Sequence, residues 1–138
     1  MMTKNRYATD WVEQSTALCK PARVVWCDGS EEEKNTLTDE AVAQGVLIRL
    51  NQEKLPGCYL HRSNPNDVAR VEQCTYICTP TQDEAGPTNN WASPQEMRQK
   101  LRTLCDGAMR GRTMYVVPYL MGPPGSPLAK VGIELTDS

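Results

Sequence analysis

The sequence predicts a single domain of the α/β class over residues 1–138, with a mixed β-sheet flanked by helices. The chain of 138 residues has the length of one domain, and its 39% hydrophobic content is ordinary for a globular protein. Segments with helical spacing alternate with short β-branched and aromatic runs, as in α/β folds. Several successive strands are joined by connections too short for a helical crossover, so the sheet must include antiparallel pairs.

The first helix is predicted over residues 10–19. Asp10 is the expected N-cap, Glu13 completes a capping box, and Pro21 follows the end of the helix. The run at residues 23–27 has strand composition and ends at an Asp-Gly turn.

Two further helix starts follow. Ser30 with Glu33 forms a capping box, and Thr38 opens another helix toward Gly45. Residues 46–50 fit either a continuation of that helix or a strand, and residues 58–60 are predicted to form a strand.

A turn-rich loop is predicted at residues 62–67, because Asn64 and Asp67 favour turns and Pro65 disfavours a helical Asn64. A strand is expected at residues 75–79. The polar segment 80–90, rich in helix and strand breakers, is predicted to be a loop.

The clearest helix begins after Ser93, with Pro94 as its first residue and Glu96 as the capping-box partner. Its apolar residues recur at helical spacing and predict one buried face. That face comprises Met97, Leu101, Leu104, Cys105 and Met109. Strands are predicted at residues 113–121 and 131–135, with a loop at residues 122–127 between them.

The composition of the chain argues against nucleic-acid binding, membrane association and secretion. The net charge of −2 offers no general attraction to nucleic acid or to an anionic membrane. No segment approaches the roughly 20 apolar residues of a membrane span, and the N-terminus has no apolar signal core. The cytoplasm is therefore the expected location.

The six cysteines are expected to be reduced thiols, most of them small core residues. The nearest pair, Cys74 and Cys78, is separated by three residues, and His61 is the single histidine. A structural zinc site is therefore not expected. His61 is predicted to lie at a strand edge or on the surface.

Two segments invite a phosphate- or anion-binding interpretation. Residues 122–126 lack the spacing of a P-loop, and their prolines remove backbone donors, so a structural turn is predicted. In residues 67–72, Arg70 has the side chain suited to bidentate recognition of carboxylate or phosphate. From the spacing alone, a surface ion pair of Arg70 with Asp67 or Glu72 is the favoured interpretation.

Several strings resemble motifs of the GTP-dependent phosphoenolpyruvate carboxykinase family, and they occur in the family's order. They are residues 28–32 (DGSEE), 67–72 (DVARVE), 85–91 (AGPTNNW), 111–118 (GRTMYVVP) and 121–138 (MGPPGSPLAKVGIELTDS). The resemblance is to the GTP class and not to the ATP class. It implies the N-terminal domain of that enzyme, whose reaction converts oxaloacetate and GTP to phosphoenolpyruvate, GDP and carbon dioxide in gluconeogenesis or anaplerosis.

The resemblance also implies site residues. Arg70 matches an arginine on a mobile loop that grips the substrate carboxylate, and Glu72 matches an acidic residue that helps to position that loop. Cys74 stands where family members often carry a charged residue, Tyr76 and Tyr119 where they carry phenylalanine, and Pro124 where leucine is usual. No catalytic residue and no metal ligand is expected in this chain.

The family's Mn²⁺, its GTP or GDP with Mg²⁺ or Mn²⁺, and its P-loop all belong to sequence beyond residue 138. The chain is therefore expected to be an excised or truncated part that is inactive alone and has the C-terminal domain as its partner. One alternative is a free-standing module that binds a dicarboxylate or a protein. Another is a non-functional fragment with an exposed former interdomain surface.

Overall fold

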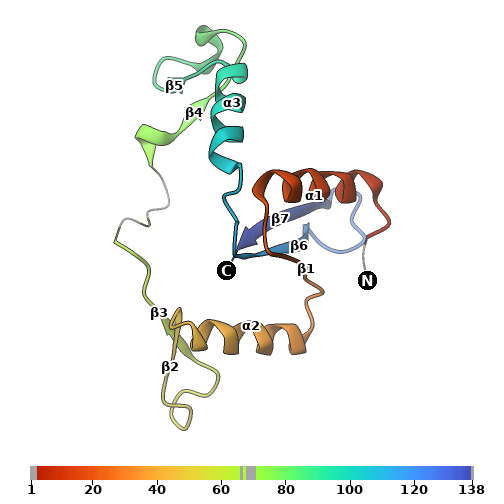
Figure 1. Ribbon diagram of the computed structural model, residues 1–138, viewed down its shortest axis with the longest axis vertical. Helices are drawn as coiled ribbons and strands as arrows, with labels where there is room; N and C mark the ends of the chain where they lie inside the picture. The colour runs from red at the N-terminus through yellow and green to blue at the C-terminus, as the bar shows by residue number, and fades with distance from the viewer. Residues whose placement is uncertain (1–2, 66, 68–70, 138) are drawn as a thin grey trace. The chain divides into compact units, whose positions relative to one another are not determined.

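The computed structural model describes residues 3–65, 67 and 71–137. The chain divides into two compact units, Met1–Asp28 with Gln73–Ser138, and Gly29–Glu72. Figure 1 shows the helices and strands of each unit. The predicted α/β class is confirmed, but the strands form three small sheets instead of one.

The main sheet of the first unit is mixed, as predicted. It consists of β1 (Arg23–Trp26), β6 (Thr113–Met121) and β7 (Lys130–Asp137). β1 pairs with β6 in parallel, and β6 pairs with β7 in antiparallel orientation through a short hairpin connection. β1 covers only the first half of β6, so residues 117–121 of β6 pair with β7 alone.

Helix α1 (Arg6–Cys19) lies along this sheet (Figure 1). It starts one turn earlier than predicted, because the Asn5 side chain accepts the backbone N–H groups of Tyr7 (3.0 Å) and Ala8 (3.4 Å). Asp10, the predicted cap, instead forms an ion pair with Arg6 at 3.5 Å on the helix surface. The helix ends at Lys20, which adopts a left-handed conformation (φ 55°).

The core of the first unit is small. Val12 of α1 and Met114 and Val116 of β6 are buried, and the Thr16 hydroxyl donates to the Met114 sulfur (3.7 Å). Met114 and Val116 alternate with half-buried residues, so one face of β6 carries the core beneath α1.

A second part of this unit contains β4 (Tyr76–Ile77), β5 (Asn90–Trp91) and α3 (Pro94–Cys105). β4 and β5 pair in parallel. The segment 80–90 is not only a loop, because it contains a 3-10 helix, η2 (Gln82–Ala85), and the first residue of β5. The indole N–H of Trp91 donates to the Thr79 carbonyl (3.0 Å), which folds the segment back on itself.

The capping of α3 is confirmed, but its buried face is not. The Ser93 hydroxyl accepts the Glu96 N–H (3.2 Å) and donates to the Glu96 carboxylate (2.9 Å). Leu101 and Leu104 remain 51% and 64% exposed, and α3 has no buried residue. The apolar periodicity correctly identified a helix, but Leu101 and Leu104 of its apolar face remain exposed among the described residues.

The second unit consists of α2 (Glu31–Ala43) and the antiparallel pair β2 (Leu47–Arg49) and β3 (Tyr59–His61). Ser30 caps α2, accepting the Glu33 N–H at 3.1 Å. The prediction that a second helix starts at Thr38 was wrong, because Thr38 lies inside the continuous helix α2. Its hydroxyl donates to the Lys34 carbonyl (2.7 Å) one turn earlier in the same helix. The open alternative at residues 46–50 is resolved as a strand.

Candidate functional site

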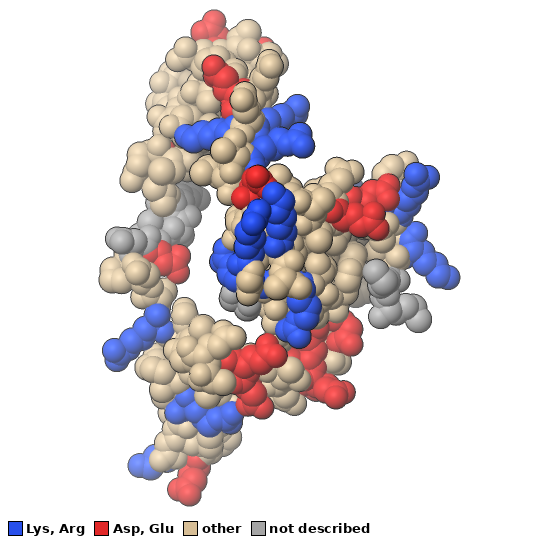
Figure 2. Space-filling model, in the orientation of Figure 1, with Lys and Arg blue, Asp and Glu red and all other residues tan. Residues whose placement is uncertain are grey.

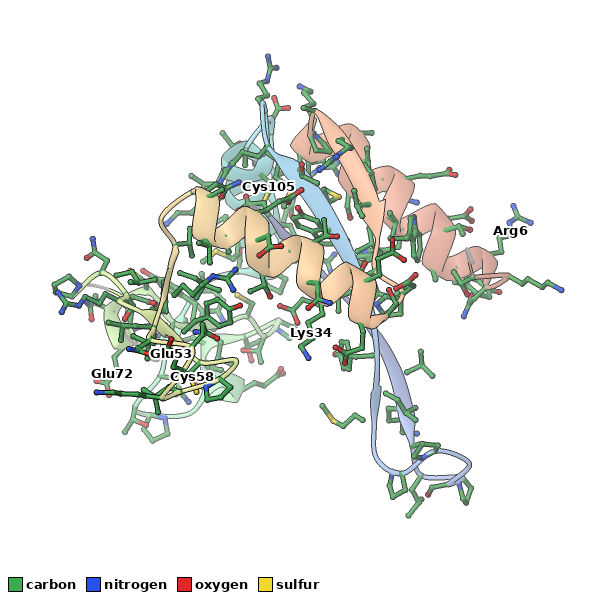
Figure 3. All side chains as sticks on the ribbon, turned by 90° about the horizontal axis from the view of Figure 1, so that it is seen from below. Arg6, Lys34, Glu53, Cys58, Glu72 and Cys105 are labelled. Carbon is green, nitrogen blue, oxygen red and sulfur yellow. The ribbon has the colours of Figure 1, made fainter. Side chains whose placement is uncertain are left out.

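The substrate-binding loop predicted around Arg70 lies between β3 and β4. Arg70 itself lies outside the described residues. On the N-terminal side of the loop, the Asp67 N–H donates to the Asn64 carbonyl at 2.8 Å, which confirms the predicted turn. On the C-terminal side, Glu72 is the first residue of the 3-10 helix η1 (Glu72–Cys74), and its side chain is exposed (Figure 3).

The described flanks of the loop are thus a hydrogen-bonded turn at Asn64 and the 3-10 helix that begins with the exposed Glu72. The carboxylate of Glu72 adds negative charge beside an arginine-bearing loop. Such a side chain can accept hydrogen bonds from a guanidinium or from backbone N–H groups, but it cannot itself attract a carboxylate substrate.

The cysteines are not core residues, in contrast to the prediction. Cys58, Cys74 and Cys78 are exposed, and Cys19, Cys27 and Cys105 are half-buried, all as free thiols. The buried apolar residues among the described positions are Val12, Ala85, Met114 and Val116 instead. Within the described ranges, no group of three or more His, Cys, Asp or Glu side chains is placed to hold a metal ion.

His61 is exposed at the end of β3, as predicted. Its Nδ1 lies 2.9 Å from the Val46 carbonyl oxygen, across the β2–β3 pair. This contact suits a structural imidazole at a strand edge, with no nucleophile or carboxylate hydrogen-bonded to it in the described contacts.

The glycine- and proline-rich segment 122–126 forms the turn of the β6–β7 hairpin, which confirms the structural interpretation. The Ser126 N–H donates to the Pro123 carbonyl (3.2 Å), and the Ala129 N–H donates to the Ser126 carbonyl (3.1 Å). Gly122 (φ 109°) and Gly125 (φ 80°) supply backbone conformations that other residues rarely adopt.

An apolar cleft of about 460 Å³ lies between α1 and β1, and the sequence analysis missed it. It is lined by Thr9, Val12, Glu13, Thr16, Ala17, Val24 and Trp26. The sequence contained one indication of this cleft: Val24 and Trp26 are two residues apart in a strand, so their side chains lie on the same face of it. Glu13 is the single ionisable group in the lining, so the cleft lacks the paired charged groups of a catalytic centre.

Basic side chains gather over α3 and the segment after it (Figure 2). The sequence of α3 and of the segment after it contains Arg98, Lys100, Arg102, Arg110 and Arg112. Arg112 forms an ion pair with Asp137 (2.8 Å), and Lys100 lies 5.9 Å from the centre of the Tyr76 ring. This local excess of positive charge contrasts with the acidic first turn of α2, formed by Glu31, Glu32 and Glu33.

Lys20 forms an ion pair with Asp106, the residue after α3. The hydrogen bond and the charge of Lys20 lower the pKa of the Asp106 carboxyl below its ordinary value. In the first unit this contact links the end of α1 to the end of α3. No helix within the described part of the chain is long and apolar enough to cross a membrane.

Curated proteins named Phosphoenolpyruvate carboxykinase (GTP) align with nearly the whole chain. The protein of Anaeromyxobacter dehalogenans is 63% identical over 136 residues, which cover 99% of this chain and 23% of that protein. The protein of Neocallimastix frontalis is 52% identical over 134 residues, or 97% of this chain and 22% of that protein. The chain thus spans less than a quarter of the length of these relatives.

The protein of Chlamydia muridarum, which carries the same name, is 56% identical over 128 residues, covering 93% of this chain and 21% of that protein. The family described as Phosphoenolpyruvate carboxykinase N-terminal domain matches residues 10–138. Because this match covers most of the chain, including the 67–72 loop and the β6–β7 hairpin, the chain belongs to the phosphoenolpyruvate carboxykinase N-terminal domain family.

Proposed function

We propose that this chain is the N-terminal, substrate-binding part of a GTP-dependent phosphoenolpyruvate carboxykinase. The enzyme converts oxaloacetate and GTP to phosphoenolpyruvate, GDP and carbon dioxide. The observation that carries this proposal is the unbroken family match over residues 10–138. It is supported by relatives of that name at 63% and 52% identity.

Arg70 binds the substrate carboxylate in this proposal. Oxaloacetate and phosphoenolpyruvate are both multiply charged anions, and a guanidinium offers two parallel N–H donors to a carboxylate. Arg70 falls within the DVARVE string, between the turn at Asn64 and the 3-10 helix that begins at Glu72. Glu72 helps to fix the end of this loop in the same proposal.

The rest of the polypeptide supplies the nucleotide and metal sites. Decarboxylation leaves an enolate that must approach the γ-phosphate of GTP, and cations are needed to neutralise both anions. Mn²⁺, with a second divalent ion on the nucleotide, supplies that neutralisation when bound. The described residues offer no three-ligand group for such an ion. In this proposal both ions bind to the C-terminal part of the enzyme, which is the physical partner of this chain.

A chimera tests the proposal. This chain is joined in register to the remaining three-quarters of the Anaeromyxobacter dehalogenans protein, in place of the matched residues. The expected result is GTP-dependent formation of phosphoenolpyruvate from oxaloacetate by the chimera, and none by the 138 residues alone. A folded chimera that binds GTP but forms no product would contradict the proposed activity.

Arg70→Ala in the active chimera tests the site residue. Loss of a charge-assisted contact of about 1.5–3 kcal/mol raises the KM for oxaloacetate roughly 10- to 150-fold, while the KM for GTP stays unchanged. Arg98→Ala, at an exposed position of α3, is the matched control and leaves both KM values unchanged. If both substitutions changed the KM for oxaloacetate equally, or if neither changed it, Arg70 would not be a substrate ligand. Glu72→Gln is expected to give a smaller increase in the same KM.

A further inference from the structure

The C-terminal ends of α1 and α3 are held side by side by backbone hydrogen bonds. The Gly107 N–H donates to the Leu18 carbonyl (2.8 Å), and the Met109 N–H donates to the Cys19 carbonyl (3.0 Å). One residue further along α1, the Lys20 ammonium forms its ion pair with Asp106. These three contacts fix the two chain segments against each other over several residues.

Cys19 and Cys105 lie inside this contact region. Each directly precedes a member of the Lys20–Asp106 ion pair. Cys19 is the last residue of α1, and Cys105, which is labelled in Figure 3, is the last residue of α3. Both side chains are half-buried and both are free thiols. The cysteines at positions 58, 74 and 78 are instead exposed.

The electrostatics of Cys19 agree with this geometry. Burial raises the pKa of the Cys19 thiol, and the neighbouring Cys105 raises it further, since two thiolates would repel each other. Cys19 is therefore held as a protonated thiol near neutral pH, with the second sulfur within electrostatic reach. A pair of thiols in this arrangement is stable when reduced and needs an oxidant to react.

We propose that Cys19 and Cys105 form an oxidisable dithiol, which closes to an intramolecular disulfide when the chain meets a small-molecule disulfide such as oxidised glutathione. The inference is independent of the proposed enzymatic function. It needs no residue of the substrate loop and no part of the polypeptide outside this chain.

The reaction proceeds by thiol–disulfide exchange. The Cys105 sulfur, as its thiolate, attacks one sulfur of oxidised glutathione, which breaks the glutathione S–S bond and releases one glutathione thiolate. Cys19 then loses its proton to solvent or to that thiolate, and its sulfur attacks the Cys105 sulfur of the mixed disulfide. The second glutathione leaves. The two cysteines are oxidised by two electrons, and one oxidised glutathione becomes two reduced molecules.

The structural consequence is a covalent tie between α1 and α3. Because α1 lies on the β1–β6–β7 sheet, the bond would fix the end of α3 relative to that sheet (Figure 1). It closes a long loop in the unfolded chain, and closure of long loops stabilises the folded state most in the chain-entropy description. Oxidation should therefore raise the urea midpoint of unfolding, and dithiothreitol should return it to the starting value.

The test is an oxidation of the folded chain with oxidised glutathione, followed by alkylation of the remaining thiols and peptide mass spectrometry. The expected product is a Cys19–Cys105 peptide pair with a mass loss of two hydrogens, while Cys58 is alkylated. Cys19→Ser and Cys105→Ser abolish the product and the rise in the urea midpoint. Cys58→Ser is the matched control and retains both.

Two results would overturn the proposal. One is a stable mixed disulfide of glutathione on Cys105 with Cys19 still open to alkylation. The other is a Cys19–Cys105 product that forms only in urea, since the bond would then belong to the unfolded chain. Circular dichroism of each serine variant separates loss of the bond from loss of the fold. The same oxidation of the chimera shows whether the two thiols also react in the longer polypeptide.

Discussion

At the scale of single residues, Lys20 has two structural roles that the sequence does not reveal together. It ends α1 in a left-handed conformation (φ 55°) that costs a non-glycine residue about 1–2 kcal/mol. Its N–H donates to the Thr16 carbonyl (2.9 Å), and its ammonium pairs with Asp106, 86 positions further along the chain. Pro21 indicated that a helix ends here, but long-range partners of a lysine leave no local pattern.

Asp106→Asn tests this ion pair through its pH dependence. The pKa of Asp106 is lowered in the folded chain, so its carboxylate stabilises the fold above the ordinary pKa of 3.8 and loses that effect as the pH falls through the lowered value. The variant should therefore have a lower urea midpoint than wild type at pH 7, and the difference should vanish at strongly acidic pH.

Both side chains of this pair are about half exposed, so the difference at pH 7 is expected to be small. Glu134→Gln, at an exposed position of β7, is the control for loss of one carboxylate. A difference between wild type and Asp106→Asn that stays constant down to pH 2 would argue against the ion pair as its source.

The candidate site shows where reasoning from local residue chemistry ends. Asp67, Arg70 and Glu72 fit a surface ion pair as well as an anion site, because charge and spacing in one loop are the same in both cases. The family resemblance of the surrounding string, not the physics of the loop, favoured substrate binding. Arg70 as a substrate ligand remains a prediction for the chimera to test.

At the scale of elements, local sequence patterns predicted the strands whose pairing partners are near in the sequence. β6 has the predicted bounds, and β7 extends the predicted strand by one or two residues at each end, because a hairpin is specified by alternating residues and a short turn. The predicted start of α1 was wrong because Asn5 and Asp10 are both residue types that cap helices, and the sequence alone does not show which of them does so. α3 was correctly placed, but burial of its apolar face depends on a partner that periodicity cannot identify.

Met114→Ala tests the assignment of the core to one face of β6. Met114 is fully buried beneath α1, so truncation should lower the free energy of unfolding by about 2–5 kcal/mol through lost burial and a residual cavity. Met121→Ala, on the same strand but 66% exposed, should change it by less than about 0.5 kcal/mol. Urea unfolding of both variants measures the difference. Similar losses in the two would mean that the core does not lie at this end of β6.

At the scale of the whole molecule, the chain buries little of its apolar surface. Four apolar side chains are buried among the described residues, those of Val12, Ala85, Met114 and Val116. In the first unit, Leu104, Leu128 and Val131 are 64%, 82% and 80% exposed. Exposed aliphatic side chains of this size mark interfaces where they form a contiguous patch. We interpret these side chains as a surface that further polypeptide covers in the relatives, which have more than four times the length of this chain.

The β6–β7 hairpin is the sharpest place to test this interpretation. Leu128 and Val131 lie at its turn end, beyond the part of β6 that β1 covers. If the remaining polypeptide covers them, each would bury an aliphatic side chain, with a contribution of roughly 1.5–3 kcal/mol. Leu128→Asp and Val131→Asp should then lower the thermal stability of the chimera. In the isolated chain they should instead reduce concentration-dependent self-association in sedimentation velocity, because there the same surface is exposed.

Thr136→Asp, at an exposed position on the same strand, is the matched control and should change neither property. The two aspartate substitutions are expected to be unfavourable in the chimera, where they lower thermal stability, and favourable in the isolated chain, where they reduce self-association. This contrast distinguishes a covered surface from the alternatives. A general effect of added charge would act alike on Thr136→Asp, and a defect in the hairpin itself would destabilise the isolated chain as much as the chimera. A loss of thermal stability in the chimera together with reduced self-association of the isolated chain requires one kind of surface. That surface is apolar, exposed in this chain and covered in the chimera.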